Sequence, residues 1–339
     1  MESGLKNYVA SFLIGREERH QNMAVFPITT PPDGGPDYET LKEALEKGTF
    51  VVTEVSEGGN VPNLKVTNKG VVPVLLIDGE ELAGAKQNRV LNTTILVKGG
   101  TEVVIPVSCT EQGRWSYISR EFHDAGHVMV PNMRAMNKRA VAASLENARE
   151  FRADQGEVWK CLYRMAVVTG TESRTGAMKD VFESKKDDLD AYLESFACKA
   201  GQKGILVMIG DKVVGFDFVS REAAFSLLYP KLIKSYAMEA WIEGRQEKKK
   251  QNKEPAQAEA VAGEEDPKAR EFLAAVAESS GKAYDSVGMG QDFRFDGKGI
   301  VGSALVVDEK LVHMAFFGAT DSQKIENMAG PSRRRSFRA

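Results

Sequence analysis

The 339-residue sequence has few cysteines and no long hydrophobic run. Its three cysteines, Cys109, Cys161 and Cys198, are an odd number without C-x-x-C spacing, which argues against a disulfide framework and a zinc ribbon. No apolar stretch approaches the roughly 20 residues that a bilayer-spanning helix needs, and the first residues lack the features of a cleavable leader. We therefore expect a cytoplasmic protein without a membrane partner.

Familiar catalytic motifs are also missing. The chain contains no P-loop, no G-x-G-x-x-G after a strand, no G-x-S-x-G and no H-E-x-x-H. These absences lower the expectation of NTPase, Rossmann, serine-hydrolase and zinc-protease chemistry. The 45 Lys and Arg residues nearly balance 48 Asp and Glu, giving a net charge of −3, which argues against DNA binding through the whole surface.

The composition, with 42% hydrophobic and 27% charged residues, is that of a globular protein. Short runs rich in Val, Ile and Thr recur with Gly turns up to residue 107, and helical periodicity dominates after residue 133. We predict an α+β fold: an N-terminal β-rich sandwich or barrel-like body, then helices, and a small closing antiparallel meander. The predicted regions are a β-rich body at residues 1–132 with the candidate site, a helical region with a β-hairpin at 133–244, a charged linker at 245–266, a helix plus meander at 267–325 packing back on the body, and a basic tail at 326–339. Asp37 and Thr175 are predicted helix caps.

The densest group of polar side chains lies in one short segment that is predicted to be extended. Alternate side chains of a strand point to opposite faces, so Gln87 and Arg89 share one face. The other face carries Lys86, Asn88 and Asn92. A guanidinium binds phosphate or carboxylate, and amides can read a base edge or ribose hydroxyls, which predicts a binding site. The alternative is a solvated edge strand whose polar residues deter aggregation.

A second group of functional side chains follows the apolar strand that ends near Ser108. Cys109 is a candidate nucleophile if a nearby cation lowers its pKa; the alternative is a buried strand cysteine. Glu111 is a candidate general acid/base or metal ligand, Arg114 a second anion clamp, and Trp115 a stacking wall. Alternatively, Glu111 and Arg114 pair with each other and Trp115 belongs to the core.

Three isolated features favour structural roles. His123 and His127 are four residues apart, but a glycine and a nearby proline disfavour the helix that would bring them to one metal, so we assign no metal site. The alternative is a metal held with the neighbouring Glu121 and Asp124, and the sequence does not identify a cofactor. Asp217 lies within an apolar strand, where a salt bridge is the favoured interpretation and a site carboxylate the alternative. His313 stands alone on the last predicted strand, and we interpret it as structural.

The segments PVLLIDGEELAGAKQNRVLNTTILV and IPVSCTEQGRW resemble the ARG and rhodanese-phosphatase-superfamily-associated protein domain family. The resemblance implies a setting in ADP-ribose, nucleotide or RNA-repair metabolism, beside an ADP-ribosylglycohydrolase or phosphatase partner, and it implies no established reaction. Residue by residue, it places the following side chains in the candidate site: Glu81, Lys86, Gln87, Asn88, Arg89, Asn92, Ser108, Cys109, Glu111, Arg114 and Trp115.

Two functions of different classes follow from these residues. The first is an intracellular enzyme that hydrolyses an ADP-ribose-like, nucleotide or RNA-end substrate or transfers a group from it, with Glu111 and Cys109 as catalytic groups. The second is a non-catalytic module that binds such a phosphate-bearing ligand for a partner enzyme. In either case a turn at Gly99 and Gly100 should return the chain antiparallel, so that residues 86–92 and 108–115 line one pocket.

Overall fold

A computed structural model describes residues 6, 8–31, 35–148, 150–251, 266–297 and 299–318, and of residues 248–251 the backbone alone. Over these ranges nine antiparallel strands form the largest sheet. They are β1 (Leu13–Ile14), β2 (Glu18–His20), β3 (Met23–Thr29), β13 (Gln202–Ile209), β14 (Lys212–Val219), β15 (Gly281–Asp285), β16 (Gln291–Gly297), β17 (Ile300–Val307) and β18 (Lys310–Gly318). Their order is β1-β3-β13-β14-β18-β17-β16-β15, with β2 also paired to β3.

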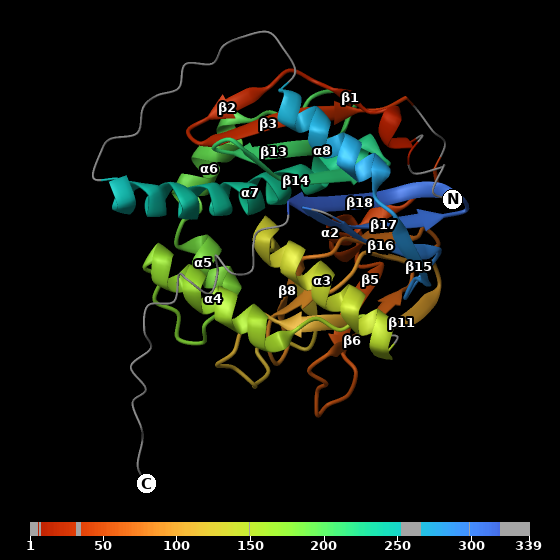
Figure 1. Cartoon of the computed structure of the whole chain (residues 1–339). Helices are drawn as coiled ribbons and strands as arrows, with labels where there is room; N and C mark the ends of the chain where they lie inside the picture. The colour runs from red at the N-terminus through yellow and green to blue at the C-terminus, as the bar shows by residue number, and fades with distance from the viewer. Residues whose placement is uncertain are drawn as a thin grey trace.

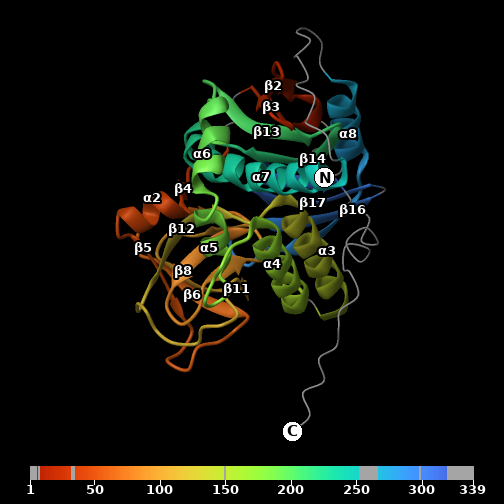
Figure 2. The ribbon, with the colours of Figure 1, turned by 90° about the vertical axis from the view of Figure 1, so that its left-hand side faces the viewer.

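A smaller β body lies below this sheet (Figures 1 and 2). Its strands are β4 (Glu39–Thr40), β5 (Phe50–Glu54), β6 (Asn63–Asn68), β7 (Val74–Leu76), β8 (Glu80–Gly84), β9 (Arg89–Leu91), β10 (Ile95–Val97), β11 (Thr101–Cys109) and β12 (Phe122–Val128). They form a six-stranded sheet, β12-β8-β9-β11-β6-β5, and a three-stranded sheet, β10-β7-β4. One apolar core that includes Val52, Leu64 and Ile105 fills the body. The predicted β-rich N-terminal body is confirmed.

Helices cover both faces of the large sheet. The described helices are α2 (Leu41–Glu46), α3 (Pro131–Ala148), α4 (Gln155–Thr169), α5 (Met178–Glu183), α6 (Lys186–Ser195), α7 (Glu222–Gln251) and α8 (Pro267–Glu278). Val25 of β3 shares a core with Ile233 of α7, whereas the next residue, Phe26, shares another core with Phe272 of α8. Because both of its faces are covered, β3 is apolar at successive positions instead of alternating with polar residues.

The closing meander belongs to the large sheet. Strands β15 to β18 are antiparallel neighbours, and β18 pairs with β14, where Ala315 lies opposite Asp217. The α+β fold is therefore confirmed. The sequence did not reveal that β3 joins this sheet by pairing with β13, where Phe26 lies opposite Leu206. Residues 1–132 are consequently divided between the large sheet and the smaller body. The sequence did not predict this division, because strand pairing over such a separation leaves no local pattern.

Two predicted helix starts are wrong in detail. Helix α2 is capped by Thr40 instead of Asp37, because Thr40 and Glu43 form a reciprocal capping box. The helix expected after Thr175 is divided into α5 and α6, neither of which has a side-chain cap.

The predicted linker and tail fall partly outside the described residues. Helix α7 continues to Gln251, so residues 245–251 of the predicted linker are helical. Residues 252–265 and the predicted tail 326–339 lie outside the described residues. No helix of the described ranges has the length and apolar character to cross a bilayer.

Candidate functional site

Strand pairing brings the two predicted motifs together. Arg89 of β9 lies opposite Cys109 of β11 and opposite Leu82 of β8, so these three side chains share one face of the sheet. Ser108 and Glu81 lie opposite Val90 and face the other side. The antiparallel pairing of β9 with β11 is therefore as predicted, but the Gly99–Gly100 turn forms no hairpin, because β10 before it pairs with β7 in the three-stranded sheet. The candidate residues nevertheless divide between two faces of the sheet and do not form one pocket.

Arg89 is buried completely, and its guanidinium is only partly paired. Its Nη1 donates to the carbonyl and side-chain oxygens of Gln87, at 2.8 and 3.1 Å, and to the Asn88 carbonyl at 3.3 Å. Among the described residues no acceptor is hydrogen-bonded to its Nε or Nη2. The nearest carboxylate oxygen to Nη2 is Oε1 of Glu54, at 3.9 Å, beyond hydrogen-bond range. Burial lowers the pKa of Arg89, with the neighbouring Cys109 and Glu54 opposing this effect.

Trp115 lies over Arg89, and together with Tyr117 and Lys86 it forms a layer that we call the aromatic cover. The Trp115 ring centroid lies 5.5 Å from Cζ of Arg89, and Trp115 itself is 47% exposed. Lys86 Nζ lies 5.5 Å from the Trp115 ring and 5.0 Å from the Tyr117 ring. Two contacts hold this cover against the opposite loop: Lys86 Nζ donates to the Gly58 carbonyl at 2.8 Å, and the Tyr117 hydroxyl donates to the Glu57 carbonyl at 3.2 Å.

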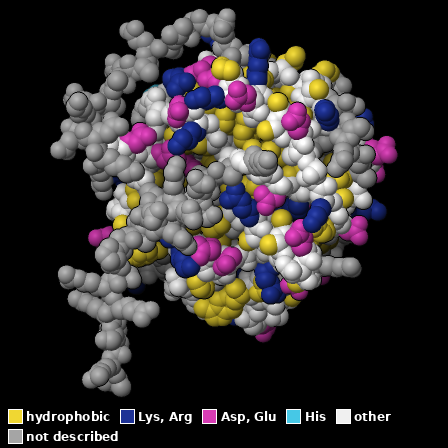
Figure 3. All heavy atoms as spheres, in the orientation of Figure 1, with side chains coloured by type: hydrophobic (Ala, Val, Ile, Leu, Met, Phe, Trp, Pro, Cys, Tyr) yellow, Lys and Arg dark blue, Asp and Glu magenta, His cyan; other side chains and the backbone are white. Residues whose placement is uncertain are grey.

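Exposed hydrophobic side chains surround this cover. Ile118 is 67% exposed and Val61 42%, beside the half-exposed Trp115 and Tyr117. Figure 3 shows hydrophobic side chains gathered at the lower end of the molecule, where Figure 1 draws the loops beneath β6 and β8. Trp115 is therefore not a core residue, which leaves its predicted role as a stacking wall.

Arg114 and Glu111 organise the loop that carries Trp115. Arg114 Nε and Nη2 donate to the two carboxylate oxygens of Glu111, at 2.9 and 2.5 Å. Its remaining donors reach the carbonyls of Gly84, Ala85 and Ser116 and the Asn88 side chain. Glu111 and Arg114 therefore pair with each other, as the alternative interpretation of the sequence expected. Arg114 has no donor left for an anion in this conformation.

Glu111 is held in its ionised form. Burial would raise its pKa, but hydrogen bonds from Arg114, from Thr175 and from the backbone of Asn88 outweigh that effect and lower the pKa. A carboxylate with a lowered pKa is a poor general acid near neutral pH.

Cys109 is a buried strand cysteine in the described structure. Burial raises the pKa of its thiol to about 11, and the nearby Arg89 only partly opposes this effect. Its backbone N–H and carbonyl pair with the side-chain amide of Gln155, at 2.7 and 2.9 Å. The thiol form therefore prevails at neutral pH, which weighs against the predicted nucleophile.

Glu81 lies on the opposite face of the sheet from Arg89. Its Oε1 accepts a hydrogen bond from Thr110 Oγ1 at 2.8 Å, and no hydrogen-bond partner of Oε2 lies among the described residues. Burial raises the pKa of Glu81 to about 8, despite the Thr110 hydrogen bond. Asn92 and Ser108 also lie away from Arg89 and bond to each other at 2.8 Å.

We expect Glu81→Gln to flatten the decline of stability with rising pH. The folded state holds the Glu81 proton up to pH about 8, whereas the ordinary pKa is 4.5, so ionisation favours unfolding between these values. The contribution of Glu81 to the free energy of unfolding should fall by up to about 1.4 kcal/mol per pH unit in that window. Glutamine keeps an oxygen acceptor for Thr110. Urea unfolding at pH 5, 6, 7 and 8 measures the effect, and a constant difference between the two proteins would contradict it.

Sequence reasoning missed Glu54 and Tyr117. Strand β5 alternates buried and partly exposed positions, and Glu54 occupies a buried one. A carboxylate at a buried position of an alternating strand is a signal that a buried cation faces it. Tyr117 carried no comparable signal, because its position depends on the loop after β11.

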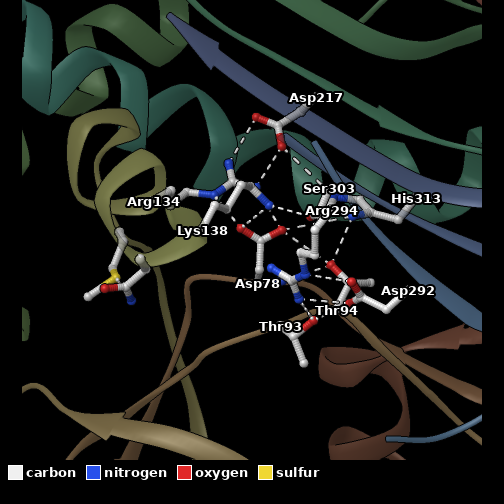
Figure 4. Close-up of polar contacts among 12 residues, drawn as sticks. Asp78, Thr93, Thr94, Arg134, Lys138, Asp217, Asp292, Arg294, Ser303 and His313 are labelled. Atoms are coloured by element: carbon white, nitrogen blue, oxygen red, sulfur yellow. Dashed lines mark hydrogen bonds and ion pairs between the residues drawn. The ribbon is translucent and has the colours of Figure 1, made fainter. Parts of the chain in front are cut away.

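A second polar cluster lies between the smaller body and the large sheet (Figure 4). Arg134 of α3 donates to Asp217 of β14 at 2.9 and 2.7 Å and to Asp78, in the turn before β8, at 3.2 Å. Tyr236 of α7 donates to the same Asp217 at 2.7 Å. The salt bridge expected for Asp217 is therefore confirmed.

The same cluster extends to the meander strands. Lys138 Nζ lies 2.9 Å from Asp78 and 2.6 Å from Ser303 Oγ, and burial lowers the pKa of Lys138 to about 8. His313 bonds to Thr94 at 2.9 Å, and burial lowers its pKa to about 4. Arg294 pairs with Asp292 and also donates to Thr93 (Figure 4). These contacts join the smaller body, α3 and the large sheet, which is a structural role.

No three His, Cys, Asp or Glu side chains of the described ranges lie together as a group that could hold a metal ion.

Comparison with known proteins gives one family. Neither the curated proteins nor the solved structures provide a match. The family model of the ARG and Rhodanese-Phosphatase-superfamily-associated Protein domain matches residues 11–317, which include the Arg89 site and the cluster around Asp78. The chain therefore belongs to this family.

Proposed function

We propose that the chain binds a phosphate-bearing ligand with a flat ring, such as ADP-ribose or a nucleotide, at the site formed by Arg89, Trp115 and Lys86. The observation that supports this most strongly is the guanidinium of Arg89, which is fully buried while its Nε and Nη2 have no hydrogen-bond acceptor among the described residues. A buried charge without full pairing is costly to the fold, and an anionic ligand would compensate it.

The site chemistry fits this ligand class. Nε and Nη2 form one edge of the guanidinium fork, which matches two oxygens of a phosphate. The exposed Trp115 ring offers a stacking surface for a base, and Lys86 adds a second positive charge beside it. Gln87, whose side-chain oxygen accepts a hydrogen bond from Arg89 Nη1, adds an amide.

Ligand entry requires the aromatic cover to open, because Arg89 has no exposed surface. Among the described residues, only single hydrogen bonds, from Lys86 and Tyr117, hold the cover against the loop at residues 56–62. Bonds of this kind contribute about 1 kcal/mol each, so binding energy can offset their loss. The loop that carries Trp115 is anchored more firmly, because the backbone N–H groups of Ser116 and Ile118 donate to the carbonyls of Lys86 and Ala85. We therefore expect binding to be coupled to movement of the loop at residues 56–62.

The contacts favour binding without catalysis. The predicted acid/base Glu111 is ion-paired with Arg114, and the Cys109 thiol has a raised pKa. Neither group is prepared to transfer a proton or attack a phosphorus or glycosidic carbon near neutral pH. We therefore prefer a reader of the ligand over the hydrolase or transferase hypothesis. The family name fits a reader that works with an ADP-ribosylglycohydrolase or phosphatase partner.

A thermal-shift panel of ADP-ribose, NAD, nucleotides and RNA ends phosphorylated at one terminus tests the proposal. A ligand at about 100 times its dissociation constant should stabilise the protein by about 2.7 kcal/mol. Trp115→Ala should weaken binding by about 1–3 kcal/mol through lost stacking. Tyr163→Ala is the matched control, because Tyr163 is also an exposed aromatic residue, 72% exposed, and lies on α4.

Two outcomes would contradict the proposal: no shift with any ligand of the panel, or equal losses in Trp115→Ala and Tyr163→Ala. Chromatography of the ligand after incubation separates a reader from an enzyme. We expect unchanged ligand, and turnover that Glu111→Gln abolishes would restore the enzyme hypothesis.

A further inference from the structure

Strand β15 is an open edge of the large sheet. It lies at the end of the strand order and, within the described ranges, pairs only with β16 (Figure 1). One side of its backbone therefore presents N–H and carbonyl groups in the spacing that another strand would bind. Lys282, Ala283 and Asp285 are exposed, as expected for a strand that no described strand pairs with on this side.

A hollow of about 740 Å³ runs beside this edge. Its walls are residues 282–285 of β15 on one side and Glu146, in the last turn of α3, on the other, with Phe151 beside them. Lys282 and Tyr284 lie opposite Arg294 and Asp292, and Lys282 reaches Glu146, so both side chains face α3. A groove between a free strand edge and a helix is the geometry in which peptides bind by adding a strand.

The charge of the groove selects its occupant. Glu146 and Asp285 carry negative charges, and the last turn of α3, whose carbonyl ends are negative, has no basic residue. Lys282, the one cation among the described lining residues, lies 2.5 Å from Glu146. This ion pair is exposed, with 69% of the Lys282 side chain accessible, so breaking it costs little free energy. A basic side chain of a bound strand could replace Lys282 at Glu146.

We propose that the groove between β15 and α3 binds an extended basic peptide segment of a partner protein, which pairs with β15 as an added strand. The backbone of β15 supplies affinity, and Glu146 with Asp285 supplies preference for Lys or Arg. This site is separate from the Arg89 site and does not depend on the function proposed there.

Fluorescence anisotropy with the full chain tests the proposal. The probe is a labelled peptide of alternating Val and Arg, and its controls are the same peptide with Glu for Arg and a version methylated on the backbone nitrogens of one edge. We expect the basic peptide to bind at least about tenfold more tightly than either control, which corresponds to about 1.4 kcal/mol. Amide hydrogen exchange within residues 281–285 should slow when the basic peptide is added.

Charge reversal locates the site. Glu146→Lys should weaken binding of the basic peptide about tenfold, whereas Glu102→Lys should leave it unchanged. Glu102 is the matched control, because it is an exposed acid on β11 that forms an ion pair with Lys65 of the neighbouring β6. The proposal is overturned if the methylated peptide binds equally well, if the two variants behave alike, or if no peptide binds. It is also overturned if residues 281–285 are protected by self-association of the chain, measured as protection that rises with protein concentration.

Discussion

Asp217→Ala is expected to lower the free energy of unfolding by about 3–5 kcal/mol. The Asp217 carboxylate is completely buried and accepts two hydrogen bonds from Arg134 and one from Tyr236. Removing it leaves Arg134 with Asp78 as its remaining acidic partner, and the positive charge of the cluster is no longer balanced. Urea unfolding at pH 7, followed by circular dichroism, measures the loss.

Asp211→Ala is the control for this substitution. Asp211 belongs to the turn between β13 and β14, where its exposed carboxylate lies 3.3 Å from Lys268. Its replacement should leave the unfolding midpoint unchanged. If Asp217→Ala does not fold, Asp217→Asn, which keeps the shape of the side chain, should still shift the midpoint measurably. Equal midpoints for the Asp217 and Asp211 variants would show that the buried cluster does not stabilise the joint between the two bodies.

The double variant Arg89→Met with Glu54→Gln is expected to lose ligand binding while remaining folded. It removes both members of a loosely spaced buried pair, and such replacements are often neutral or stabilising. Glutamine at position 54 retains the acceptor for the Lys86 N–H. The ligand-dependent stabilisation, about 2.7 kcal/mol at about 100 times the dissociation constant, should disappear. Differential scanning calorimetry with and without ADP-ribose measures both effects.

Arg134→Met provides the comparison for the double variant. Both arginines are fully buried, but Arg134 has two carboxylate partners within 3.2 Å, whereas the nearest carboxylate to Arg89 lies 3.9 Å away. We therefore expect Arg134→Met to destabilise the empty protein strongly and the Arg89 variant to do so much less. Equal destabilisation would mean that Arg89 is retained for stability, which would contradict the proposed function.

Local sequence patterns predicted the pairing around the site. The Val- and Ile-rich runs on either side of Gly99 and Gly100 predicted that the chain returns antiparallel, and β9 does pair with β11. The expected hairpin at that turn was wrong, because β10 pairs with β7 in another sheet. The alternation of side chains separated Arg89 from Asn92, which bonds to Ser108. It was wrong for Lys86, because residues 85–87 form a turn and not a strand, and Lys86 lies with Trp115 beside Arg89. These features depend on neighbouring residues, so a single sequence carries them.

Long-range partners could not be predicted in the same way. Thr93 and Asp292 bond across 199 positions, and Lys138 and Ser303 across 165. No local periodicity relates such residues, and each one alone is compatible with an exposed position. That Glu81 and Ser108 lie on the face away from Arg89 was also missed, because it depends on how β8, β9 and β11 are aligned.

The edge of the Arg89 guanidinium formed by Nε and Nη2 is the proposed contact with the ligand phosphate. Nitrogen-15 NMR of the arginine Nε–H groups tests it most directly, because buried guanidinium groups exchange slowly and Arg134 and Arg294 serve as internal references in the same spectrum. The Arg89 resonance is assigned by its loss in Arg89→Lys. We predict that titration with ADP-ribose or a nucleotide of the panel shifts the Arg89 resonance and leaves that of Arg134 in place. Binding that leaves the Arg89 resonance unchanged, or shifts the Arg134 resonance instead, would show that Arg89 does not bind the phosphate.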